Sequence, residues 1–108
     1  MAMTSARRIQ NYVGQIVREF HPERVVMFGS YATGTPHRDS DVDLLVVMRH
    51  RGPAVAQAAQ IRQSIRAGFP LDIIVRSPTE VQKRVAMGDG FICEILEKGK
   101  VLHEACGS

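Results

Sequence analysis

Two aspartates two positions apart, Asp41 and Asp43, stand at the start of an apolar run that continues to Met48. If the run is a β-strand, alternate side chains share a face, so both carboxylates point the same way. Their positions would lie roughly 6.6 Å apart along the strand. One or two divalent ions can bridge such a span, because the ions of two-metal sites are about 3.5–4 Å apart. Mg²⁺ binds through one or two carboxylates plus substrate phosphates, so the pair predicts a Mg²⁺ site for a phosphorylated substrate.

A glycine–serine turn precedes these carboxylates. The segment 24–28 is predicted to be a short buried strand that stops at Gly29 and Ser30, and a brief helical turn follows and ends at Gly34. Exposed N–H groups at such a turn attract anions, Gly29 allows close approach to the backbone, and the Ser30 hydroxyl adds a phosphate ligand. Ser30 by itself is more often an ordinary helix cap. The spacing to Asp41 and Asp43 favours the phosphate-binding interpretation.

The polar loop 35–40 then returns to the carboxylate strand and carries His37 and Arg38. Both side chains are candidates for phosphate contact. An equally good interpretation is that both are solvated residues of the loop. Of the two, Arg38 is predicted to bind the nucleotide.

A third carboxylate, Asp72, interrupts a second apolar segment, 71–75. A buried charge is costly unless it is paired or bound to a metal. The alternative is an aspartate on a half-exposed edge strand. Together with Asp41 and Asp43 the residue predicts a catalytic triad that also holds the metal. Asp72 suits the general base, because neighbouring carboxylates raise its proton affinity.

With these residues in place, the chain resembles the minimal nucleotidyltransferases of the polymerase-beta-like superfamily. The family pattern is Gly-Ser, a short helix, Asp-x-Asp on one strand and a third Asp on a later strand, which Gly29, Ser30, Asp41, Asp43 and Asp72 match. The resemblance implies the nucleotidyltransferase fold. It also implies Mg²⁺-dependent transfer of a nucleoside monophosphate, most often from ATP, to an acceptor hydroxyl with release of pyrophosphate.

Small members of this family commonly pair with helical HEPN-domain proteins. The resemblance therefore implies an antitoxin that adds AMP to a tyrosine of a HEPN-type toxin, binds the toxin, or does both. Relatives often carry an arginine near the position of Thr33. Since this chain has only hydroxyls there, the triphosphate contact must come from Arg38, Arg76 or elsewhere.

The alternation of predicted helices and strands indicates an α/β (α+β) fold over residues 1–108 as a single domain. We expect a small mixed sheet of three to four strands with helices mainly on one face, which would leave the carboxylate face open. Helices are expected from Thr4 or Ser5 to Phe20, over 53–67, after Ser77 and over 91–98. In the last of these, Phe91 and Ile95 are expected to point inward.

Composition limits the other classes of function. The formal charge is +3 and the pI about 9.2, but the arginines are scattered and only 6% of residues are aromatic, which argues against nucleic acid as a principal partner. Cys93 and Cys106 are too few for a disulfide framework. No membrane span or signal peptide is expected, so we expect a cytoplasmic protein.

Two alternatives to an enzyme stay open. The first is a binding subunit with weak or no catalysis that neutralises a helical partner by contact, in a hetero-oligomer. A weaker alternative is a sensor that binds ATP without transferring any part of it.

Overall fold

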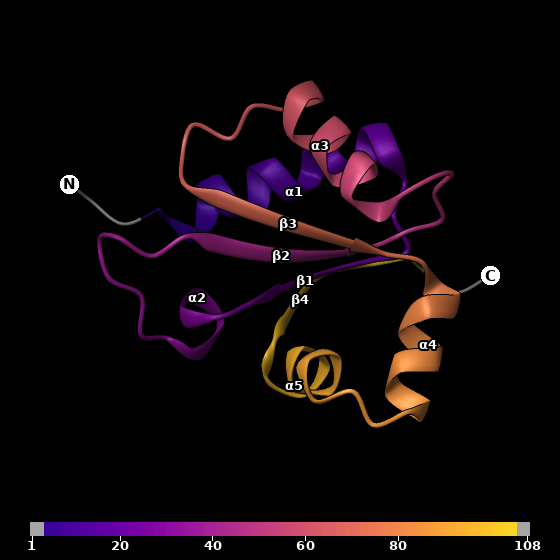
Figure 1. Cartoon of the computed structure of the whole chain (residues 1–108). Coiled ribbons are helices and arrows are strands. Elements are labelled where there is room, and N and C mark those ends of the chain that lie inside the picture. The colour runs from indigo at the N-terminus through magenta and orange to yellow at the C-terminus, as the bar shows by residue number, and fades with distance from the viewer. Residues whose placement is uncertain (1–3, 106–108) are drawn as a thin grey trace.

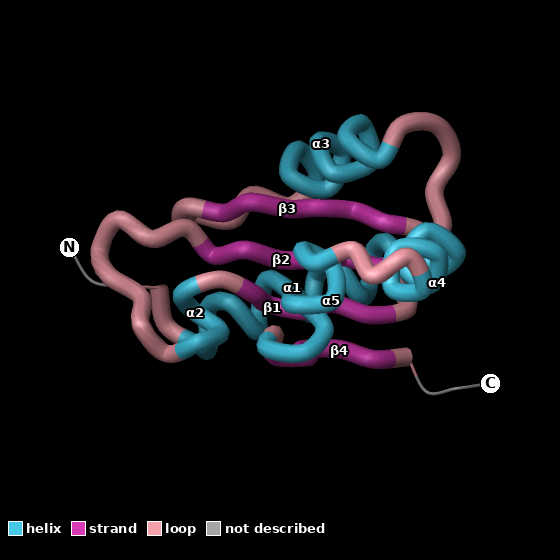
Figure 2. Tube along the Cα trace, turned by 60° about the horizontal axis from the view of Figure 1, so that its bottom comes forward, coloured by secondary structure: helices cyan, strands magenta, loops and turns pink. Residues whose placement is uncertain are grey.

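The computed structural model describes residues 4–105. In chain order the elements are α1 (Ala6–Phe20), β1 (Arg24–Phe28), α2 (Ser30–Thr33), β2 (Val42–Val47), α3 (Ala54–Ser64), β3 (Leu71–Arg76), α4 (Pro78–Ala86), α5 (Gly90–Lys98) and β4 (Lys100–Glu104). The strands form one sheet in the order β3-β2-β1-β4 (Figure 2). The β2–β3 pair is parallel, and β1 is antiparallel to both β2 and β4. The mixed four-stranded sheet of an α/β fold is thus confirmed.

The first face of the sheet is covered by α1 and α3 (Figure 1). Ser5 caps α1 by accepting a hydrogen bond from the Arg8 amide, 3.2 Å away. The apolar stripe of α1 packs on the even-numbered side chains of β2, among them Leu44 and Val46, which are fully buried. This face therefore holds the larger core, and it fixes the orientation of β2.

The second face carries the odd-numbered residues of β2, and α4 and α5 pack on it below the sheet in Figure 1. Leu45 and Val47 are buried there against Val81, Ile92 and Ile95. The expectation of helices mainly on one face needs correction on this point. Because β2 is apolar on both faces beyond Asp43, exposing either face to water would be costly, and helices are required on both.

The cover on the second face is incomplete, and this decides where a site can form. The helices α4 and α5 cover the residues that follow Asp43, whereas the start of β2 and of β3 projects beyond them on the side where α2 lies (Figure 1). Only one end of the second face is therefore open. The expectation that the whole carboxylate face is open needs correction.

The third helix ends at Ser64, three residues before the expected end, because Ile65 has extended backbone and turns into the buried core. Within residues 4–105, no helix combines the length and apolar character needed to cross a membrane.

Candidate active site

Asp43 and Asp72 are register partners on the parallel strands β2 and β3. Cross-strand partners point to the same face of a sheet and lie about 5 Å apart, so the two carboxylates are neighbours. Asp72 is exposed and Asp43 is half-buried. Strand alternation alone puts Asp41 and Asp43 on one face, but only strand pairing brings Asp72 beside them.

The electrostatics of Asp43 show that all three acids share one environment. Burial raises the pKa of the Asp43 carboxyl, and the negative charges of Asp72 and then Asp41 raise this pKa further. No arginine, lysine or histidine among residues 4–105 forms an ion pair with any of the three. The cluster therefore carries uncompensated negative charge at a solvent-open position.

Gly29 lies directly against this cluster. Its backbone has φ of 77° and ψ of −158°, a conformation essentially restricted to glycine. A Cβ atom placed on Gly29 would overlap the Asp43 carboxylate. Phe28, the residue before it, is the register partner of Asp43 on β1. The glycine turn and the carboxylate pair are thus parts of one site.

Ser30 begins α2, as predicted from the sequence, and Gly34 ends it in the left-handed conformation. The Gly29 carbonyl accepts hydrogen bonds from the amides of Ala32 and Thr33, which leaves the first amides of the turn directed out of the helix start. Thr33 also hydrogen-bonds back to its own turn, since its hydroxyl donates to the Ser30 carbonyl at 3.3 Å. The backbone of the turn is therefore its main anion-attracting feature.

Arg38 lies at the tip of a small turn. The amide of His37 donates to the Ser40 hydroxyl, and the amide of Ser40 donates to the His37 carbonyl. Arg38 is exposed and forms none of the ion pairs found within residues 4–105. Its role in nucleotide binding stays a prediction.

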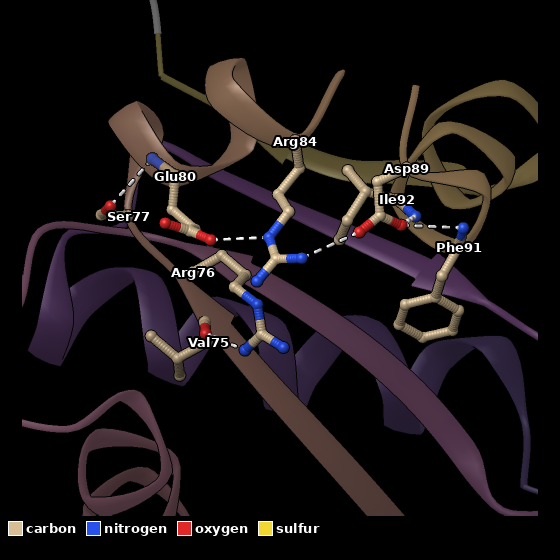
Figure 3. A network of polar contacts seen from close by, with 8 residues as sticks. All are labelled: Val75, Arg76, Ser77, Glu80, Arg84, Asp89, Phe91 and Ile92. Atoms are coloured by element: carbon tan, nitrogen blue, oxygen red, sulfur yellow. Dashed lines mark hydrogen bonds and ion pairs between the residues drawn. The ribbon is translucent and has the colours of Figure 1, made fainter. Parts of the chain in front are cut away.

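Arg76 lies away from the site. It follows Asp72 by four residues on β3, roughly 13 Å along the strand, and its guanidinium donates to the Val75 carbonyl at 2.8 Å. Figure 3 shows it below Glu80 and Arg84 of α4. Arg76 therefore does not fit the triphosphate contact for which it was a candidate.

A pocket of about 320 Å³ adjoins Asp43, and the part that α5 plays in its walls was not foreseen from the sequence. Its walls come from the end of β1, from α2, from Asp43 and from α5, and comprise Phe28, Gly29, Thr33, Asp43, Phe91, Glu94, Ile95, Lys98 and Gly99. The helical stripe placed Phe91 inward, but its side chain is 50% exposed. The exposure of Phe91 could have been predicted from its position in the first turn of α5, where a side chain can extend beyond the core.

The donor set fits a hard divalent cation. Asp41, Asp43 and Asp72 offer only carboxylate oxygens, and a cation would relieve the mutual repulsion that, after burial, raises the Asp43 pKa. Within residues 4–105, however, no group of three or more histidine, cysteine, aspartate or glutamate side chains is arranged so that it could hold a metal ion by itself. A Mg²⁺ ion here would need oxygens from a substrate and from water as well, which is how Mg²⁺ is usually bound.

The fold and site together define an α/β domain in which a glycine turn suited to anions adjoins an acidic pair on neighbouring strands. The chain belongs to the nucleotidyltransferase domain family, whose model matches residues 7–104. No curated protein matches it.

Solved structures agree with this assignment. A protein of Sulfolobus solfataricus assigned as a nucleotidyltransferase is 25% identical, with a TM-score of 0.57 over 71% of this chain and 70% of that one. Two toxin–antitoxin structures are each 20% identical and cover 89% of this chain and 73% of theirs. One was solved with AMP-PNP and has a TM-score of 0.58, and the other, a mutant of MntA-HpeT, has a TM-score of 0.57. At 20% identity these two support the fold.

Proposed function

We propose that this domain transfers a nucleoside monophosphate, AMP from ATP, to a hydroxyl of a partner protein in a Mg²⁺-dependent reaction. The observation that carries the proposal is the juxtaposition of Asp43 and Asp72 on neighbouring strands, directly beside the Gly29 turn. Two adjacent carboxylates repel a triphosphate. They can bind it when a divalent cation lies between the carboxylates and the phosphates.

Each residue has a role in this proposal. Backbone amides at Gly29 and Ser30 seat the β- and γ-phosphates, and Asp41 and Asp43 hold the ion, with Asp72 as a further ligand or as the base. Bound Mg²⁺ would neutralise charge on the phosphates. The acceptor oxygen forms a bond to the α-phosphorus while the bond from that phosphorus to the bridging oxygen breaks. Pyrophosphate leaves, and Asp72 takes the proton of the acceptor hydroxyl.

The proposed partner is a helical HEPN-type toxin, with this chain as its antitoxin. The support is the sequence resemblance stated above, together with the similarity in fold to chains from toxin–antitoxin structures. A tyrosine of the partner would be the acceptor hydroxyl.

The experiment is transfer of label from ATP labelled at the α-phosphate into the purified partner, with Mg²⁺ present or chelated. We expect Asp43→Asn to reduce incorporation by at least about 100-fold, because positioning and charge neutralisation supply most of the catalysis. Asp39→Asn is the matched control, since Asp39 is an exposed loop aspartate close in sequence. Incorporation by Asp43→Asn at the wild-type rate would refute the proposal.

Neutralisation of the partner by contact alone is the second candidate. The observation that favours it is the exposure of two apolar side chains, Val85 and Met87, near the end of α4. The double variant Asp41→Asn/Asp43→Asn separates the two functions. If this variant neutralises the toxin as well as wild type does, contact is sufficient and transfer is dispensable.

A further inference from the structure

We propose that the pocket between α5 and the end of β1 binds the nucleobase of the triphosphate substrate, with Phe91 as its stacking surface. This inference rests on the proposed function and adds to it the part of the site that recognises the nucleoside. The pocket has the size of a small-molecule site, at about 320 Å³.

The aromatic wall of the pocket supports this assignment. Phe28 and Phe91 meet edge to face, with ring centroids 5.8 Å apart and an interplanar angle of 89°. Phe91 is 50% exposed, although a phenylalanine at this position would gain stability by full burial. An exposed aromatic face next to a phosphate-attracting turn is suited to a planar base, because stacking on aromatic side chains is a general mode of base binding.

Phe91 is also held in place from outside the pocket. The Asp89 carboxylate caps α5 by accepting hydrogen bonds from the Phe91 and Ile92 amides at 2.9 and 3.1 Å, and it accepts another from Arg84 of α4 at 3.2 Å (Figure 3). At the other end of α5, a Cβ on Gly99 would overlap the Ile95 carbonyl and Val26, so this end packs closely on β1. The wall is therefore fixed at both ends before a ligand arrives.

The position of the pocket favours the nucleotide over the acceptor. Its walls include Gly29 and Asp43 but not Asp72, and β3, which carries Asp72, is separated from β1 by β2. In the proposed reaction the acceptor hydroxyl approaches Asp72, so the acceptor enters from the β3 side. The pocket is on the β1 side, next to the turn that seats the phosphates.

The rim supplies polar groups for the edge of the base. Glu94 and Lys98 line the pocket and form an exposed ion pair at 3.5 Å. Such a pair is weak in water and can rearrange. Its carboxylate can accept from an exocyclic amino group, such as that of adenine, while the ammonium group donates to ring nitrogens or to the ribose.

The test compares two ligands by calorimetry on the full chain: ATP with Mg²⁺, and inorganic tripolyphosphate with Mg²⁺, which has the phosphates but no nucleoside. We expect Phe91→Ala to raise the Kd for ATP by about tenfold, within the range that loss of one stacked base gives, and to leave the Kd for tripolyphosphate unchanged. Phe91→Trp should keep wild-type affinity for ATP. Val101→Ala is the matched control, since Val101 is 51% exposed and lies outside the pocket.

Each other result has a distinct meaning. An unchanged Kd for ATP in Phe91→Ala, or an equal loss for both ligands, overturns the base pocket. Unchanged ATP binding with slower transfer to the partner would assign the pocket to the acceptor instead. If wild type binds tripolyphosphate as tightly as ATP, the base pocket is refuted while the phosphate turn stands. If wild type binds neither ligand, the proposed function fails and the inference fails with it.

Discussion

Asp43 and Asp72 face the same way from adjacent parallel strands, and burial together with the charge of Asp72 raises the pKa of Asp43. The fold thus places two like charges side by side at the open end of a sheet face, where no cation among residues 4–105 pairs with them. Such an arrangement costs stability and is retained in many proteins at functional sites.

The raised pKa of Asp43 predicts how stability depends on pH. The folded protein binds this proton more tightly than the unfolded chain, so the free energy of unfolding falls as pH rises from the unfolded value of 3.8 through the raised folded pKa. We expect Asp43→Asn to melt at a slightly higher temperature than wild type at pH 7 without Mg²⁺, and to lose this advantage below pH 4. Thermal melts between pH 3 and 8 measure the effect, and a lower melting temperature for the variant at pH 7 would contradict it.

Addition of Mg²⁺ should reverse this order. A cation bound to the carboxylates stabilises only the folded wild type, by about 2.7 kcal/mol at a concentration 100 times its Kd, and Asp43→Asn should lose most of this gain. Melting temperatures with and without MgCl₂ test the prediction, with Asp39→Asn as the control for general charge screening. An equal Mg²⁺ effect on wild type and Asp43→Asn would show that the ion does not bind at this carboxylate.

Gly29→Ala should damage both stability and the site. Positive φ at a non-glycine residue costs of order 1–3 kcal/mol, and at Gly29 the added Cβ must also displace the Asp43 carboxylate. Gly52→Ala is the control, because Gly52 has φ of 71° and open space around it. Chemical denaturation should show a larger loss for Gly29→Ala, and nucleotide transfer should fall only in that variant. Similar losses of stability in the two variants would contradict the close approach.

The two arginines considered for the triphosphate should behave differently. Arg76 is bonded to the Val75 carbonyl at the far end of β3, so Arg76→Ala should leave the KM for ATP within about twofold of wild type. Arg38→Ala should raise that KM by about tenfold if the loop folds over the phosphates, as one charge-assisted hydrogen bond is worth roughly 1.5–3 kcal/mol. Steady-state transfer assays compare the variants, and a large effect of Arg76→Ala would refute this placement.

The stability that Asp89 contributes as the cap of α5 should depend on pH in the opposite sense to the contribution of Asp43. Hydrogen bonds from the Ile92 and Phe91 amides and the contact with Arg84 lower the pKa of Asp89. Its contribution is therefore present above the unfolded value of 3.8 and is lost as pH falls through the lowered folded pKa. We expect Asp89→Ala to lower the melting temperature at pH 7 and to approach wild type in strong acid. An equal difference at pH 7 and pH 2 would contradict the role of the charge.

Local sequence determined much of this protein. Strand alternation and turn chemistry are short-range effects, so residue types and their spacing over a few positions predict them. These effects put Asp41 and Asp43 on one face of a strand. They also predict the turn at Gly29 and Ser30 and the apolar runs of β2 and β3. The family pattern then identified the nucleotidyltransferase fold, which the match over residues 7–104 confirms.

Tertiary structure decided what depends on contacts between distant segments. Strand order and register place Asp72 beside Asp43, whereas Arg76 lies at the opposite end of β3 from these carboxylates. The packing of α5 on the second face produced the pocket and left Phe91 half exposed, where a helical stripe predicts burial. An apolar stripe indicates which side of a helix faces the core. Whether each residue of that stripe is covered depends on where the helix lies relative to the sheet, and the packing of the whole chain sets this position.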